Sequence, residues 1–82
     1  MIEISETAAA AVRQSEEAAR RFNPDARIRL RSDGGGVRFE LTERPEDTDV
    51  PVDCGGATLY VEAGLGGRLD TGEHNAPVLR PE

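Results

Sequence analysis

This 82-residue chain has almost no cysteine, and it lacks tryptophan and lysine altogether. The sequence contains one cysteine and no tryptophan, and all ten of its basic residues are arginine. Because Cys54 is alone, the chain cannot form an internal disulfide or a metal cage made only of its own cysteines. These absences narrow the chemistry that the chain can perform by itself.

Long apolar runs and an excess of positive charge are missing as well. No run of about 18 apolar residues is present to span a membrane. The polar, acidic start Met-Ile-Glu-Ile-Ser-Glu is unlike a signal peptide, so we expect a cytoplasmic protein. The net charge of −6 argues against nucleic-acid binding, which requires basic charge to neutralise phosphates. No nucleophile and base occur in a recognisable arrangement, so we do not expect an enzyme.

The composition predicts one small globular domain over residues 1–82. Apolar residues make up 37% of the chain and charged residues 32%, which is typical of a folded protein. A chain of this length buries only about 60–65% of its unfolded surface. Its stability should therefore be marginal unless it dimerises.

The first quarter of the chain predicts a short strand followed by the one main helix. Residues 2–4 alternate between apolar and polar, and Ser5 offers an N-cap hydroxyl. Apolar residues then recur at helical spacing, and Asn23-Pro24 ends the pattern, since proline disfavours helical geometry in the residue before it. The expected inner face holds Ala8, Ala9, Val12, Ala19 and Phe22; the expected outer face holds Glu6, Arg13, Glu16, Glu17, Arg20 and Arg21.

The remaining chain alternates with the period of short strands, interrupted by glycine-rich turns. Ile28 and Leu30 are expected to point inward, and the glycine-rich segment 63–68 is expected to form at most a short, weak helical turn around Leu65. The order predicts an α+β fold with about six to seven short strands, mostly antiparallel or mixed, and one main N-terminal helix. The expected strands cover residues 27–31, 37–42, 50–54, 57–62, 69–71 and 76–79, with turns at 32–36, 55–56 and 72–75.

Several short segments, taken in order, resemble the HesB/IscA-like family of A-type iron–sulfur cluster carriers. They extend over nearly the whole chain. The resemblance implies the strand-rich fold of that family and a link to iron–sulfur cluster assembly. The similar segments are IEISETAA at residues 2–9, IRL at 28–30, the glycine run at 34–36, LYVE at 59–62 and LD at 69–70.

The resemblance also implies a cluster site that this chain does not complete. In the family, one cysteine follows the glycine run and a Cys-x-Cys pair lies in a C-terminal tail. Here Val37 follows the run, and the sequence contains no such pair. We therefore expect no stable cluster and no other cofactor. The function that remains is contact with a protein partner of the iron–sulfur assembly system or with a second copy in a homodimer.

Two alternatives stay open at this point. In a dimer, Cys54 of both copies together with His74 would supply ligands for iron or an iron–sulfur cluster. Against this, Cys54 shares the parity of Val50 and Val52, as a small buried apolar residue would, and His74 lies in a polar turn where solvation is usual. The second alternative is a structural adaptor domain unrelated to iron.

We expect four arginines to form the surface that contacts a protein partner. They would form a basic stripe on the outer face of two neighbouring strands, suited to an acidic partner. The competing interpretation pairs them with Glu40 and Glu62 across strands, at about 0.2–1 kcal/mol for each pair. The arginines are Arg27, Arg29, Arg31 and Arg38.

The segment 43–49 concentrates acidic residues beside a proline. It lacks the ligand spacing and the central glycine of a calcium-binding loop. We therefore expect its four carboxylates to lie in solvent. They belong to Glu43, Glu46, Asp47 and Asp49.

Overall fold

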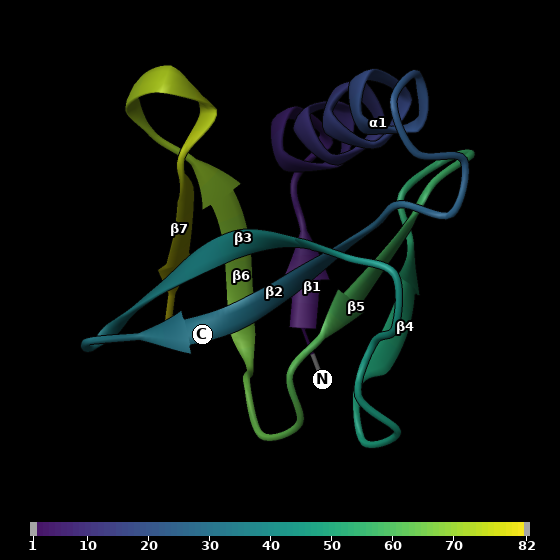
Figure 1. Ribbon diagram of the computed structural model, residues 1–82. Helices are drawn as coiled ribbons and strands as arrows, with labels where there is room; N and C mark the ends of the chain where they lie inside the picture. Colours follow the sequence, from purple (N-terminus) through teal and green to yellow (C-terminus); the bar gives the residue numbers. More distant parts are fainter. Residues whose placement is uncertain (1, 82) are drawn as a thin grey trace.

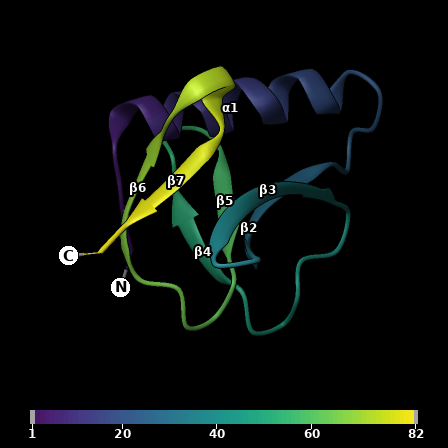
Figure 2. The same cartoon turned by 90° about the vertical axis from the view of Figure 1, so that its left-hand side faces the viewer.

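The computed structural model describes residues 2–81, which form one α-helix and seven strands in two sheets, and the expected α+β class is confirmed. One sheet has the strand order β3-β2-β5-β4 and the other β1-β6-β7. The β2–β3 hairpin crosses in front of β6, and α1 runs along the top of the strands (Figures 1 and 2). The elements are β1 Ile2–Ile4, α1 Glu6–Arg20, β2 Arg27–Asp33, β3 Gly36–Thr42, β4 Val50–Asp53, β5 Thr58–Val61, β6 Gly67–Thr71, a short 3-10 turn Glu73–Asn75 and β7 Pro77–Arg80.

The start of α1 is capped as the sequence predicts. Ser5 is in an extended conformation, and its Oγ accepts a hydrogen bond from the Ala8 amide at 3.1 Å. The Ser5 hydroxyl in turn donates to Asp70 Oδ1 at 3.0 Å, and the Thr7 hydroxyl donates to the same oxygen at 2.9 Å. The Thr71 amide also donates to this oxygen, at 2.8 Å, so one carboxylate joins the first turn of α1 to β6.

The end of α1 differs from the expectation. The helix stops at Arg20, so Phe22 lies beyond it and is 92% exposed instead of packing inward. Glu16, expected on the outer face, is buried, because it lies one turn from the buried Val12 on the same side of the helix.

Within residues 2–81, no helix combines the length and the apolar character needed to cross a membrane.

The core lies among α1, the β2–β5 pair and β6, whose Leu69 is fully buried. Ile28 and Leu30 on β2 are fully buried, which confirms their predicted inward direction. They stand opposite Leu59 and Val61 on β5, in a parallel pairing. Because neighbours in a parallel pair are far apart in sequence, the local alternation predicted both strands but not their pairing.

Glycines set two of the tight turns. Gly34 and Gly35 have φ values of +56° and +90°, which allow a two-residue connection between Asp33 and Gly36. The turn is therefore shorter than the predicted 32–36, and both flanking strands are longer. The predicted hairpin across Gly55-Gly56 is confirmed by the antiparallel pairing of β4 with β5.

β6 begins two residues earlier than the predicted strand at 69–71. Residues 63–64 form a turn and residues 65–66 an irregular connection, so Leu65 is not part of a helical turn. β6 starts at Gly67, whose φ is +109°, and a Cβ at this position would collide with the carbonyl oxygen of Arg80 on the neighbouring β7. The last predicted hairpin, formed by β6 and β7, is confirmed.

Replacing Leu59 with alanine should lower the free energy of unfolding by about 2–5 kcal/mol, because this β5 side chain is fully buried in the core. Strand parity alone predicts the same loss for Phe39→Ala. Phe39 is only partly buried on the edge strand β3, so we now expect a smaller loss. Urea unfolding of both variants measures the difference, and equal losses would contradict the assignment of the core to β2 and β5.

Candidate interaction surface

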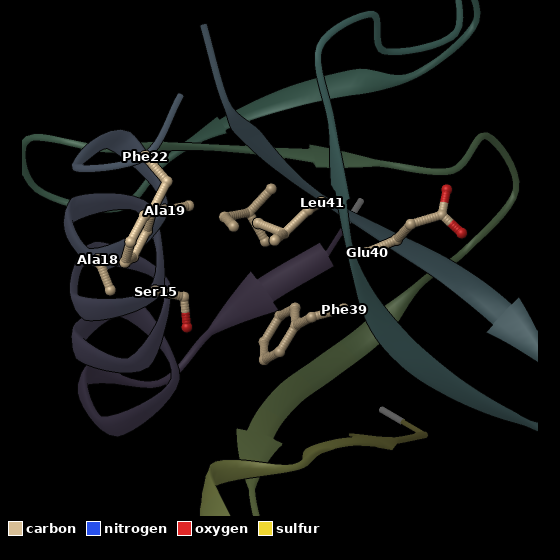
Figure 3. Close-up of a pocket in the computed structure, with 8 residues that line it drawn as sticks. Ser15, Ala18, Ala19, Phe22, Phe39, Glu40 and Leu41 are labelled. Atoms are coloured by element: carbon tan, nitrogen blue, oxygen red, sulfur yellow. The ribbon is translucent and has the colours of Figure 1, made fainter. Parts of the chain in front are cut away.

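The strand β3 presents two chemically different faces at the edge of its sheet. On one face, Phe39 and Leu41 stand opposite Leu30 and Ile28 of β2, and they point toward α1 (Figure 3). On the other face, Glu40 points away from the helix. An apolar face and a charged face therefore meet along a single exposed strand.

The charged face is organised around Glu40. Its Oε2 accepts hydrogen bonds from Arg31 Nη1 at 2.8 Å and from Arg38 Nη2 at 3.2 Å, and Arg29 Nη1 lies 3.8 Å from Oε1. The hydrogen bonds from Arg31 and then Arg38 hold the pKa of the Glu40 carboxyl below its usual value. Arg31 and Arg38 are directly opposite each other across β2 and β3, and Glu40 offsets their repulsion.

Asp49 corrects the expectation of a fully solvated acidic loop. Its side chain is 1% exposed and forms a two-pronged pair with Arg29, with Nε–Oδ2 at 3.0 Å and Nη2–Oδ1 at 2.8 Å. The amide of Glu46 also donates to Oδ2 at 3.0 Å. The Arg29 hydrogen bond lowers the pKa of Asp49. The carboxylate therefore fastens the 43–49 loop over the outer face of β2.

The four predicted arginines do share one side of the β2–β3 hairpin, but their surroundings differ. Arg29 is buried beneath Asp49, whereas the side chains of Arg31 and Arg38 are 41% and 53% exposed. Arg27 lies over the ring of Tyr60, 5.9 Å from its centroid, in a cation–π arrangement. The stripe is thus partly neutralised by its own chain.

Of the two carboxylates proposed as cross-strand partners, only one pairs with arginine among the described residues. Glu40 does so. Glu62 instead accepts hydrogen bonds from the hydroxyl of Ser32 at 2.7 Å and from its amide at 3.3 Å. The exposed positive charge on this face belongs to Arg27, Arg31 and Arg38, of which Arg31 and Arg38 share the Glu40 carboxylate.

A groove of about 430 Å³ lies between α1 and the apolar face of β3. It forms because the helix offers small side chains, such as Ala18 and Ala19, and covers β2 more closely than β3. Among residues 2–81, three large apolar side chains are exposed, and two of them, Phe22 and Leu41, line this groove (Figure 3). The sequence placed Phe22 in the core, so this apolar groove was missed.

A second groove, of about 590 Å³, lies at the opposite edge of the sheet beside β4. Val50, the third exposed apolar residue, and Leu65 are part of its lining. β4 has only four residues, and one of them is Pro51, which has no amide hydrogen. Short edge strands that contain proline resist the addition of another strand. The seven-residue β3 has neither protection, so it is the stronger candidate for contacts.

Cys54 is a buried packing residue. It is 3% exposed, and its Sγ donates to the Val52 carbonyl at 3.8 Å. Burial raises the pKa of its thiol. Its own carbonyl accepts a hydrogen bond from Arg13 Nη1 at 2.7 Å, which holds the β4–β5 turn against α1.

His74 is exposed in the 3-10 turn between β6 and β7, with a φ of +57°. Figure 1 shows this turn on the opposite side of α1 from the β4–β5 turn that carries Cys54. The structure therefore does not bring the two candidate ligands together within one chain. Within the described range 2–81, no three side chains of His, Cys, Asp or Glu form a group that could hold a metal ion.

No family model matches the chain, and no curated protein matches it. One solved structure, a crystal structure of IscA with its 2Fe–2S cluster, is similar at 18% sequence identity and a TM-score of 0.38. The match covers 98% of this chain and 82% of the other. A likeness at this level carries no conclusion about ligands or partners.

Replacing Asp49 with asparagine should lower the free energy of unfolding at neutral pH by up to about 3 kcal/mol, because Arg29 then remains buried without its opposite charge. The pKa of Asp49 is lower in the folded state than in the unfolded state. Its stabilising contribution is therefore complete above the unfolded value near 3.9 and is lost as the pH falls through the folded value.

Urea unfolding measured from neutral pH to below about pH 4 tests this prediction, since the gap between wild type and D49N should narrow over that range. Asp47→Asn is the matched control, because it removes an exposed carboxylate from the same loop. If both variants lost the same stability, the Arg29–Asp49 pair would not be what fastens the loop.

Proposed function

We propose that this chain is a small protein-binding domain of HesB/IscA-like type that takes part in iron–sulfur cluster assembly through contacts, without a stable cluster of its own. The link to cluster assembly is supported by the five similar segments, which occur in the family's order along nearly the whole chain. The absence of a resident cluster is supported by Val37, which stands where the family places its first cysteine.

The donor groups of the chain do not fit an iron–sulfur cluster. Clusters are held chiefly by cysteine thiolates. The thiol of Cys54 is buried and its pKa is raised, so burial favours the neutral thiol. The Val37 side chain packs against the core, and His74 belongs to a separate turn. A carrier that uses Cys54 in a dimer would need to expose this side chain first.

The observation that carries the protein-binding proposal is the exposed edge of β3 beside the α1–β3 groove. A strand added along β3 would gain backbone hydrogen bonds, while its side chains would alternate between the two faces of the sheet. Toward the groove it would place apolar groups against Phe22 and Leu41. On the other face, an acidic residue beside Arg38 and a basic residue beside Glu40 would complement the charges.

Anaerobic incubation with iron and sulfide, followed by desalting, visible absorbance and iron counting, tests the cluster part of this proposal. We expect iron well below stoichiometric amounts and no stable cluster absorbance. About half an iron per chain, the ratio for one site shared by two copies, would overturn this part if it disappeared in Cys54→Ser. Iron retained in that variant would overturn it as well and would point to other ligands.

Titration calorimetry with purified iron–sulfur assembly proteins tests the partner part. We expect at least one of them to bind, and we expect Leu41→Asp to weaken that binding about tenfold or more by placing a charge in the apolar groove. Val50→Asp is the matched control, since Val50 is a similarly exposed apolar residue on the other edge strand. Absence of binding to all of these proteins would overturn the partner part of the proposal and would favour an adaptor unrelated to iron.

A further inference from the structure

We infer that β3 pairs with β3 of a second copy of this chain, antiparallel, around a two-fold axis at Phe39. The inference rests on the binding surface of the proposed function and names one occupant for it. That surface requires a strand with apolar residues on one face and paired opposite charges on the other. The sequence of β3, Gly-Val-Arg-Phe-Glu-Leu-Thr, has this pattern itself.

The backbone of β3 has the hydrogen-bonding groups that such pairing needs. The Leu30 carbonyl accepts from the Glu62 amide at 2.9 Å, on the β5 side of β2, so it does not bond to Phe39 opposite it. Positions in an antiparallel pair alternate between bonded and non-bonded. The amide and carbonyl of Phe39 therefore face the outer edge, and the same alternation applies to Val37 and Leu41. Within residues 2–81, no strand is hydrogen-bonded to this edge.

A two-fold axis at Phe39 sets the register of the pairing. Phe39 then faces Phe39 of the second copy, and Val37 faces the second copy's Leu41, on the apolar side. On the charged side, Arg38 faces Glu40 of the second copy, and the symmetry repeats this contact. The two Arg38–Glu40 contacts lie at non-bonded positions of the new pair, where opposing side chains approach most closely.

Other two-fold registers along β3 lack this match. An axis at Arg38 or at Glu40 would set each of these residues against its own copy, which places like charges together. An axis at Val37 would set Arg38 against Gly36, and an axis at Leu41 would set Glu40 against Thr42. The Phe39 register alone in this set joins opposite charges, and it does so twice.

The groove is shaped to receive the apolar side of the added strand. Phe39 and Leu41 already point into the space beside α1 (Figure 3), so the side chains of the second copy would continue the same apolar layer. Ala18 and Ala19 leave room on the helix side, and Phe22 lies over the groove from the helix end. Pairing would thus cover two of the apolar side chains that the single chain exposes.

Sedimentation analysis across the micromolar to millimolar range tests self-association. The buffer should hold about 0.15 M salt, which shortens the repulsion between two chains of net charge −6 to roughly 8 Å. We expect a reversible dimer. Arg38→Glu, which sets Glu against Glu at both contacts, should weaken dimerisation about tenfold or more. Leu41→Asp should do the same, and Val50→Asp should leave the dimer intact.

Disulfide trapping tests the register, using chains in which Cys54 is replaced by alanine. A non-bonded antiparallel pair separates its Cα atoms by about 4.5 Å, within the range that a disulfide spans. Under oxidation, chains carrying R38C should therefore cross-link with chains carrying E40C. Each variant mixed only with itself should cross-link much less, because these positions then lie diagonally across the pair.

A chain that stays monomeric over the whole range would overturn the inference. A dimer that is unchanged in both R38E and L41D would overturn it too, as would R38C chains that link best to each other. Circular dichroism of each variant confirms that its fold is kept. The outcome for the proposed function is separate: a monomer that still binds an assembly protein refutes the dimer alone, whereas a dimer that binds none refutes the partner proposal alone.

Discussion

The burial of Ile28 and Leu30 beneath α1 is the interaction on which the rest of this structure depends. These two side chains place β2 in the middle of its sheet, with β3 on one side and β5 on the other. The helix can approach closely because its inner face is largely alanine. The same small side chains limit the area that the helix covers. The sheet is therefore well sealed at β2 and β5 and open at β3, where the apolar groove lies.

On the opposite face of the sheet, two carboxylates hold the arginine side chains in place. Glu40 and Asp49 are surrounded by the arginines of β2 and β3, so this acidic protein uses part of its negative charge to organise its basic side chains. The Arg29–Asp49 pair fastens the 43–49 loop, and Glu40 keeps Arg31 beside Arg38. The charged side chains of β3 are consequently held in a defined arrangement by hydrogen bonds to Glu40.

The two edges of the larger sheet are treated differently. β4 is short and contains Pro51, whereas β3 is longer and carries an alternating pattern suited to pairing. The single thiol of the chain, at Cys54, is used for packing, and its carbonyl fixes the β4–β5 turn to Arg13 of α1. The groups that remain accessible are a strand edge, exposed apolar side chains beside it and an ordered set of charges, and these are the groups on which the proposed interaction rests.

The sequence by itself determined the local structure: the strand alternation around Ile28, the Ser5 cap, and the turns at the glycine pairs. These features depend on neighbours within a few residues, and their signals lie in residue spacing. Only the tertiary structure decided that β2 pairs in parallel with β5, that Asp49 is buried on Arg29, and that Phe22 lies in the open beyond the helix end. Each of these depends on which distant segments meet, because the same side chain is buried or exposed according to the element that covers it.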